Sequence, residues 1–179
     1  MELRRPETRH TVHDWVKWPG DWELWYGEAV ALQPPVFGHG DSQSELNYLI
    51  RDQLRRKEGC RCKVAVEVDW LVSIETGVRP DLVIVCDRDI DPDERLKHAP
   101  RLIGEILSPS TSKIDREAKW DLYADRGVGF YLLVDPKTRT VEANHLVDGA
   151  YQPLPLEKGG FGIELHDGCA VRVPQRLPD

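Results

Sequence analysis

The chain has 179 residues, and its 24 basic and 31 acidic side chains give a formal net charge of -7. This length fits one domain with a substantial core, and 40% hydrophobic and 31% charged residues are ordinary for a soluble globular protein. There is no apolar run of membrane-spanning length and no apolar signal-peptide segment at the N-terminus, so we expect a cytoplasmic protein that does not contact membranes. The acidic balance argues against tight, metal-free binding of nucleic acid, because phosphate binding favours a basic surface.

The first predicted elements are a short helix over residues 11–18 and a β-hairpin. The hairpin strands are residues 22–26 and 28–32, which flank Gly27. For the tryptophans of this region we favour packing in the core over the alternative of stacking on nucleic-acid bases.

A second helix is predicted over residues 41–57, after a break at Pro34-Pro35. Its core face consists of leucine and isoleucine side chains at helical spacing, namely Leu46, Leu49, Ile50 and Leu54. Its basic C-terminal end suits the helix dipole, although it could also contact a phosphate backbone. Two roles stay open for Glu45, which either compensates the dipole or provides a third carboxylate to a metal.

The four cysteines form no zinc-binding pattern, because Cys60-x-Cys62 has no second half elsewhere. The other two, Cys86 and Cys169, are isolated in the sequence. We therefore interpret all four as reduced structural residues rather than as a metal site.

Residues 63–74 alternate well enough to be a strand, and residues 75–77 are expected to form a turn. Two buried strands follow, and each carries one acidic residue. Asp81 opens the run 82–86, and Glu105 lies inside the run 102–107. A carboxylate in such a run must be paired, hydrogen-bonded or bound to a metal, because a lone buried charge is too costly.

Side-chain alternation places Asp81 on the face of Val83 and Val85, and Glu105 on the face of Ile103 and Leu107. If the two strands are neighbours, both carboxylates can enter one coordination sphere. Hard oxygen ligands of this kind suit Mg²⁺ or Mn²⁺, which also bind substrate phosphate.

The loop over residues 87–94 is acidic but lacks calcium-loop spacing, so we interpret it as a solvated connector. A helix with capping residues at 108–112 comes next and closes at Gly127. On this helix Lys119 can pair with Asp115 four residues earlier. The alternative role for Lys119 is to provide positive charge to a phosphate or to an attacking water.

The C-terminal part is predicted to contain strands at residues 129–134, 141–146, 149–151 and 161–163, and a frayed tail at 174–179. Altogether we expect one domain over residues 1–179. It would consist of an N-terminal helix and hairpin (11–32), a core (38–146) and C-terminal strands (147–173).

From about Trp15 to Leu165 the chain resembles the Uma-type restriction endonuclease family of the PD-(D/E)xK nuclease superfamily. The most specific feature is the run Glu105-Ile106-Leu107-Ser108-Pro109-Ser110-Thr111, which is followed by Asp115-Arg116 and Lys119. The other matching residues are the run 22–28, His39, Arg79-Pro80-Asp81, Tyr123, Gly127-Val128, Tyr131 and Val134-Asp135-Pro136.

The resemblance implies an α/β (α+β) fold of the restriction-endonuclease type, with a mixed sheet flanked by helices and often a homodimer. It implies a Mg²⁺- or Mn²⁺-dependent endonuclease acting on DNA, with Asp81 and Glu105 as metal ligands and catalytic residues. The superfamily lysine would stand at Leu107, and in this family its role is thought to move to the next helix, which matches Lys119. His39 and Glu45 fall near the family's early histidine and helix acid, and Asp115 is a further candidate.

Two alternatives to a metal-dependent nuclease stay open. One is a nuclease-like fold that binds nucleic acid or a protein without cleaving it. The other is a scaffold in which Arg79, Arg101 or Lys113 neutralises the two acids. Fold alone does not decide among them. The sequence also leaves open whether DNA or RNA is cut and at which sites.

Overall fold

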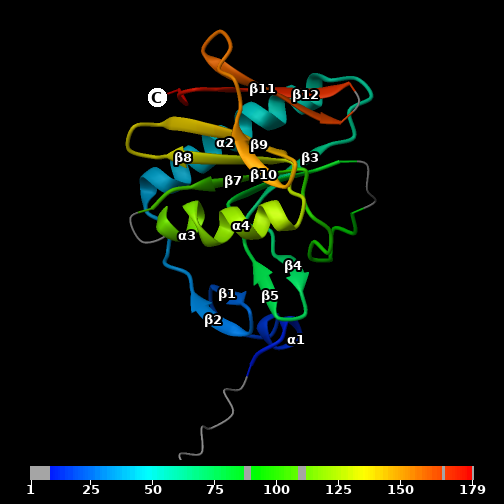
Figure 1. Cartoon of the computed structure of the whole chain (residues 1–179), viewed down its shortest axis with the longest axis vertical. Coiled ribbons are helices and arrows are strands. Elements are labelled where there is room, and N and C mark those ends of the chain that lie inside the picture. The colour runs from blue at the N-terminus through cyan, green and yellow to red at the C-terminus, as the bar shows by residue number, and fades with distance from the viewer. Residues whose placement is uncertain (1–8, 87–89, 109–111, 167, 179) are drawn as a thin grey trace, which may run out of the picture.

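The computed structural model describes residues 9–86, 90–108, 112–166 and 168–178. Its centre is a six-stranded sheet in the order β10-β9-β8-β7-β6-β3 (Figure 1). These strands are β3 (Lys63–Val66), β6 (Leu82–Val85), β7 (Leu102–Ile106), β8 (Phe130–Asp135), β9 (Thr140–Val147) and β10 (Ala150–Pro153). All neighbours are antiparallel except β7 and β8, which are parallel. The predicted mixed sheet is therefore confirmed.

Helices cover both faces of this sheet. The parallel pair β7–β8 requires a crossover, and α3 (Ser112–Arg116) and α4 (Ala118–Asp125) form it across one face (Figure 1). The opposite face packs against α2 (Phe37–Arg56) and the hairpin of β11 (Gly160–His166) and β12 (Cys169–Pro174). The sequence predicted one helix where α3 and α4 lie. The structure divides it at Glu117, whose φ of -120° and ψ of -79° are not helical.

The alternation of side chains in the central strands divides the core as expected. Val83, Val85, Ile103 and Leu107 belong to the cluster beneath α4, on the face predicted for Asp81 and Glu105. The intervening residues of the same strands pack toward α2, where Leu46, Ile50 and Leu54 are buried. The predicted core face of this helix is confirmed, although the helix begins at Phe37 rather than near residue 41.

A smaller four-stranded sheet lies below the central one in Figure 1, in the order β2-β1-β5-β4. It contains the predicted hairpin of β1 (Trp22–Trp25) and β2 (Glu28–Ala31), together with β4 (Trp70–Ser73) and β5 (Thr76–Val78). The short α1 (Val12–Trp15) packs on this sheet. A Cβ at Gly77 would lie 2.2 Å from the Trp15 ring, so glycine allows the indole to rest directly on β5.

The prediction of one strand over residues 63–74 is wrong. The chain leaves the central sheet after Val66, and Glu67 adopts a positive φ of 52°. It then enters the small sheet as β4, and the predicted turn lies at residues 74 and 75, so that Thr76 and Gly77 already belong to β5. Alternating apolar residues specify a strand, but they do not specify that its two halves belong to different sheets.

The prediction of a frayed tail is also wrong for the described residues. Leu177 is 1% exposed, and its backbone N–H donates to the Arg139 carbonyl at 2.8 Å. Gln175 likewise donates to the Gly159 carbonyl at 2.9 Å. The chain after β12 is thus fixed against the central core.

The cysteines are paired rather than reduced, which corrects a further prediction. Disulfides join Cys60 to Cys169 and Cys62 to Cys86. The first pair is separated by 109 positions in the sequence, so its proximity is a product of the tertiary fold.

Parts of two predicted segments fall outside the described residues. These are positions 87–89 of the predicted connector and 109–111 of the predicted helix cap. Within the described ranges, no helix has the length and apolar character needed to cross a membrane.

Candidate metal and catalytic site

Asp81 and Glu105 lie side by side at one end of the central sheet. Leu82 pairs with Gly104 in the antiparallel register of β6 and β7. One position further, Asp81 stands opposite Glu105, so both side chains leave the same face. Asp81 also accepts a hydrogen bond from the backbone N–H of Ile106 through Oδ2 at 2.6 Å. The predicted neighbourhood of the two acidic strands is confirmed.

Glu105 is almost completely buried, with 2% exposure, and helix α4 provides its partners. Lys119 Nζ lies 3.0 Å from Glu105 Oε1, and the Tyr123 hydroxyl donates to the same oxygen at 2.7 Å. Lys119 and Tyr123 are one helical turn apart on α4, which brings both side chains to one carboxylate.

Lys119 contacts two further carboxylates. Asp115 Oδ1 lies 3.3 Å from its amine, which confirms the predicted pair, and Glu23 Oε1 lies 3.7 Å away. We call Glu23, Asp81, Glu105 and Asp115 the acid cluster. Lys119 is the cation that contacts three of these four acids.

Glu23 is a member of the cluster that the sequence analysis missed. It is 2% exposed and reaches the site from β1 in the small sheet. Its carboxylate accepts hydrogen bonds from Trp25 Nε1 at 2.8 Å and from the Arg79 backbone N–H at 2.9 Å. The available signal was an acidic residue between apolar neighbours in a strand, which is the signal that identified Glu105.

Burial and mutual repulsion dominate the electrostatics of the cluster. Desolvation raises the pKa of Glu105 well above its usual value, and Asp81, Asp115 and Glu23 raise it further against the opposing effect of Lys119. Burial alone would lower the pKa of Lys119, but Glu105, Glu23 and Asp115 outweigh it and raise that pKa. Lys119 is therefore a permanent cation at neutral pH.

Helix α2 contributes His39 and Gln43 on the Asp81 side of the cluster. His39 Nε2 lies 3.2 Å from Asp81 Oδ2, and this hydrogen bond raises the pKa of the imidazole despite its partial burial. Gln43 donates to the Asp81 backbone carbonyl at 2.9 Å and to Glu67 at 3.3 Å. The structure thus brings the candidate residue His39 to the site and adds Gln43.

Glu45 does not join the cluster. It is two residues beyond Gln43 on α2, which places it about 200° around the helix axis. Among the described residues, no hydrogen bond or ion pair links it to the other acids. Of the candidates from the sequence, the structure therefore gathers Asp81, Glu105, Lys119, Asp115 and His39, and leaves Glu45 outside.

The three cations named in the scaffold alternative do not neutralise the two central acids. The Arg79 side chain binds Asp69 and Asp21, each at 2.7 Å. Arg101 donates to the Leu165 and Glu164 carbonyls, and Lys113 is exposed. That form of the scaffold alternative is wrong, because the basic side chains that contact the two acids are Lys119, at Glu105, and His39, at Asp81.

The donor set fits a hard divalent cation. The contacts of Asp81 fall on Oδ2 and those of Glu105 fall on Oε1, and no hydrogen bond from the described residues goes to Asp81 Oδ1 or Glu105 Oε2. Four carboxylates face one lysine and one histidine, which leaves negative charge for a metal to offset. Carboxylate oxygens are the ligands that Mg²⁺ and Mn²⁺ prefer.

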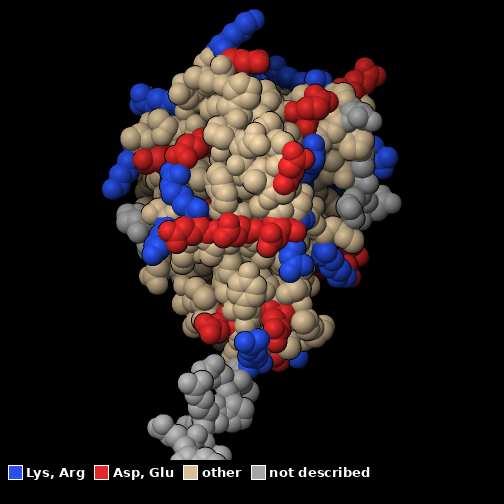
Figure 2. Space-filling model, viewed as in Figure 1, with Lys and Arg blue, Asp and Glu red and all other residues tan. Residues whose placement is uncertain are grey.

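The outer surface over α3 and α4 is acidic. Figure 2 shows a row of red side chains across this face, and Glu117, Asp121 and Asp125 are exposed at four-residue spacing along it. Such a row repels a phosphate backbone. A nucleic acid would have to reach the acid cluster from another side, such as the partly exposed edge at Asp81 and His39.

Comparisons with known proteins identify a family and a shared fold. The model of the Uma2 family, described as "Putative restriction endonuclease", matches residues 12–172. A crystal structure from Anabaena variabilis, described as "a putative nuclease belonging to DUF820", has a TM-score of 0.68 at 17% sequence identity. The match covers 88% of this chain and 90% of that one, which establishes a shared fold. A search of curated proteins gave no match.

Proposed function

From the premise that the chain belongs to the Uma2 restriction endonuclease family, we propose that it is a metal-dependent endonuclease that hydrolyses phosphodiester bonds in DNA. The single observation that carries the proposal is the facing pair of Asp81 and Glu105, with the Lys119 amine 3.0 Å from Glu105. Acidic ligands on adjacent strands and a nearby amine are the groups that metal-assisted phosphodiester hydrolysis requires.

Asp81 and Glu105 would hold Mg²⁺ or Mn²⁺ through their carboxylate oxygens. When bound, such an ion polarises the phosphate and lowers the pKa of a coordinated water. Asp81 is held for this task by the Ile106 N–H and by His39, and Glu105 by Tyr123 and Lys119. These contacts fix both carboxylates before any ligand arrives, as a preorganised site requires.

Lys119 would act by charge and not as a general base. Its raised pKa keeps the amine protonated at neutral pH, so it can orient water and offset negative charge that develops on the phosphate. Its place on α4 also fits the family's apolar residue at the usual lysine position, here the buried Leu107. Asp115, 3.3 Å from the amine, would position Lys119.

A plasmid-nicking assay with Mg²⁺ tests the proposal. We expect the wild type to convert supercoiled DNA to the open form, and Asp81→Asn and Glu105→Gln to lose at least 100-fold of that rate. Glu45→Gln is the matched control, since this helix acid lies outside the cluster and should leave cleavage unchanged. Equal nicking by the wild type and Asp81→Asn would contradict the assignment of Asp81 as a catalytic metal ligand. Parallel assays on RNA would show which nucleic acid is cut.

The second candidate is a nucleic-acid or protein-binding module without catalytic activity. It is favoured by one observation, namely that protein side chains already satisfy Glu105 with an ion pair and a hydrogen bond. Thermal unfolding distinguishes the two functions. A magnesium site stabilises the wild type by about 2.7 kcal/mol at 100 times its dissociation constant, and Asp81→Asn abolishes the gain. A binding module would show no such difference.

We also propose, on the basis of the family, that the chain forms a homodimer. Light scattering on the purified chain decides it, since a monomeric mass at all concentrations would contradict a dimer.

A further inference from the structure

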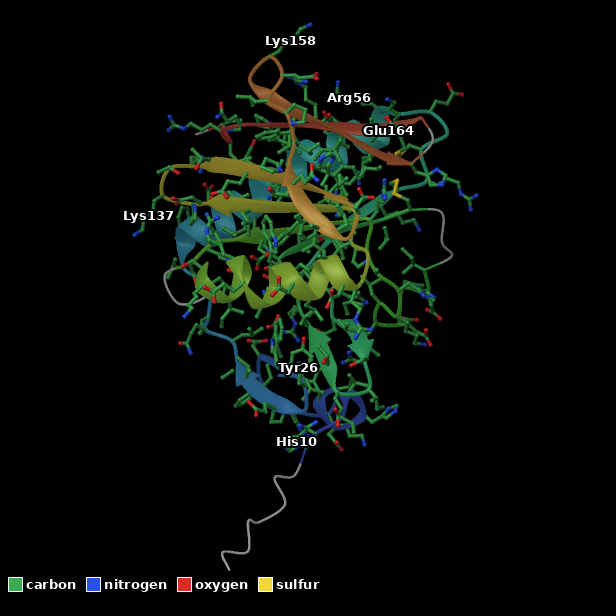
Figure 3. All side chains as sticks on the ribbon, viewed as in Figure 1. His10, Tyr26, Arg56, Lys137, Lys158 and Glu164 are labelled. Atoms are coloured by element: carbon green, nitrogen blue, oxygen red, sulfur yellow. A yellow bond between two sulfur atoms is a disulfide. The ribbon has the colours of Figure 1, made fainter. Side chains whose placement is uncertain are left out.

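The four cysteines converge on one point of the fold. The sulfur atoms of Cys60, Cys62 and Cys169 all lie within 4.8 Å of one another, and Cys86 is bonded to Cys62. They come from three separated segments, which are the loop before β3, the end of β6 and the start of β12. Figure 3 shows yellow sulfur atoms near the end of the β11–β12 hairpin where Glu164 is labelled.

We propose that these four side chains, when reduced, bind one Zn²⁺ ion as a structural four-thiolate site. With zinc–sulfur bonds of about 2.3 Å, sulfurs at the corners of a tetrahedron are about 3.8 Å apart. Three of the sulfurs already lie within 4.8 Å of each other, and the fourth is bonded to one of them. The first three sulfurs are therefore already close to tetrahedral spacing. Cys86 Sγ has to turn toward the other two once its bond to Cys62 is reduced, and rotation about the cysteine χ1 angle allows such a movement.

Charge around the cysteines supports a metal–thiolate centre. A zinc ion with four thiolates carries two net negative charges. A hollow of about 370 Å³ beside Cys60 and Cys62 is lined by the basic residues Arg51, Arg55, Lys57 and Lys63. No carboxylate lines the hollow in the described part of the chain. These cations would offset the negative charge, and they give a second reason, besides the helix dipole, for the basic end of α2.

The disulfide and zinc states are related by a balanced exchange. A dithiol reductant delivers two electrons and two protons to each disulfide, which becomes two thiols, while the dithiol becomes a disulfide itself. Zinc then displaces one proton from each of the four thiols to form four zinc–sulfur bonds. In either state the four cysteines link the loop before β3, the end of β6 and the start of β12.

The zinc site would be distinct from the acid cluster. Asp81 precedes β6 and Cys86 follows it, so the two lie about 16 Å apart along a strand that rises about 3.3 Å per residue. Sulfur ligands select zinc, whereas the carboxylates favour magnesium. The two proposals can therefore succeed or fail independently.

The test measures zinc in the full-length protein after reduction with dithiothreitol, incubation with ZnSO4 and removal of unbound metal. We expect one zinc per chain in the wild type, one in the control Asp81→Asn, and none in the double variant Cys62→Ser/Cys169→Ser. Substoichiometric zinc in the reduced wild type, or full zinc in the double variant, would overturn the proposal.

A second measurement on the wild type keeps the test decisive if the double variant does not fold. Co²⁺ in place of zinc should produce the intense sulfur-to-cobalt charge-transfer band and the visible bands of a tetrahedral thiolate site. A spectrum without a charge-transfer band would mean that the metal sits on oxygen or nitrogen ligands, and the four-cysteine site would be rejected.

Discussion

Tyr123 donates its hydroxyl hydrogen to the same Glu105 oxygen that the Lys119 amine contacts. Burial and the Glu105 charge raise the pKa of this phenol, so it stays a donor throughout the neutral range. We expect Tyr123→Phe to lower the free energy of unfolding by about 1.5–3 kcal/mol, the range for a hydrogen bond to a charged group. Urea denaturation of the metal-free protein measures it.

Tyr151 provides the matched control for this substitution. Its hydroxyl donates to a neutral acceptor, the Val128 backbone carbonyl, at 2.8 Å. Tyr151→Phe should therefore cost only about 1 kcal/mol. Equal losses in the two variants would show that Glu105 is not ionised in the folded protein.

Removing the Lys119 charge should lower the free energy of unfolding more than removing the Tyr123 hydrogen bond does. Lys119→Met leaves Glu105, Glu23 and Asp115 buried without their shared cation, and we expect a loss of about 3–5 kcal/mol. The double variant Lys119→Met/Glu105→Gln removes one of the uncompensated charges and should recover part of that loss. Urea denaturation of Lys119→Met, Glu105→Gln and the double variant gives a double-mutant cycle. If the stability losses of the two single variants simply add up in the double variant, Lys119 and Glu105 are not coupled.

The ion pair between Arg116 and Glu142 predicts a pH-dependent contribution to stability. Two hydrogen bonds of 2.8 and 2.6 Å join α3 to β9, and the bond from Arg116 lowers the pKa of Glu142. A lowered folded-state pKa stabilises the protein above the unfolded-state value and loses this effect as the pH falls through the folded value. Both groups are substantially exposed, so we expect a cost of only about 0.2–1 kcal/mol for Arg116→Ala at pH 7.

The free energy of unfolding, measured at pH 7 and at pH 3, should differ less between the wild type and Arg116→Ala at pH 3. Lys137→Ala serves as the control, because this exposed lysine forms no ion pair with the described residues. A difference that grows on acidification would contradict the assigned direction of the shift.

Leu177 tests whether the chain after β12 belongs to the core. Its side chain is 1% exposed, so Leu177→Ala should destabilise the protein by about 2–5 kcal/mol. Leu156→Ala is the control, since that side chain is 48% exposed and its loss should cost about 0.5 kcal/mol or less. Thermal or urea unfolding of both variants measures the two losses. Equal losses would contradict the packing of Leu177 in the core and would support a frayed tail.

The central part of the site was predictable from the sequence for a physical reason. An acidic residue within an apolar strand needs a partner, so Asp81 and Glu105 were visible without knowledge of the fold. Period-2 alternation also gave the correct shared face, and helical spacing gave the Asp115–Lys119 pair. These features depend only on residues that are close in the sequence.

The missed features depend on contacts between distant segments. The local pattern around Glu23 indicates a buried acid, but it does not indicate that the tertiary fold brings this acid to Lys119 on α4. The division of residues 63–74 between two sheets and the docking of Leu177 have the same origin. The pairing of Cys60 with Cys169 across 109 positions could likewise not be deduced from spacing.

The pairing of β1 with β5 also bears on how fast the site can form. Glu23 meets an amine that is 96 positions away in the sequence, and it does so only when the small sheet lies against α4. Contacts of such long sequence separation carry a large loop-closure entropy and slow the folding of the whole chain. A refolding molecule should therefore form its helices first and complete the acid cluster last.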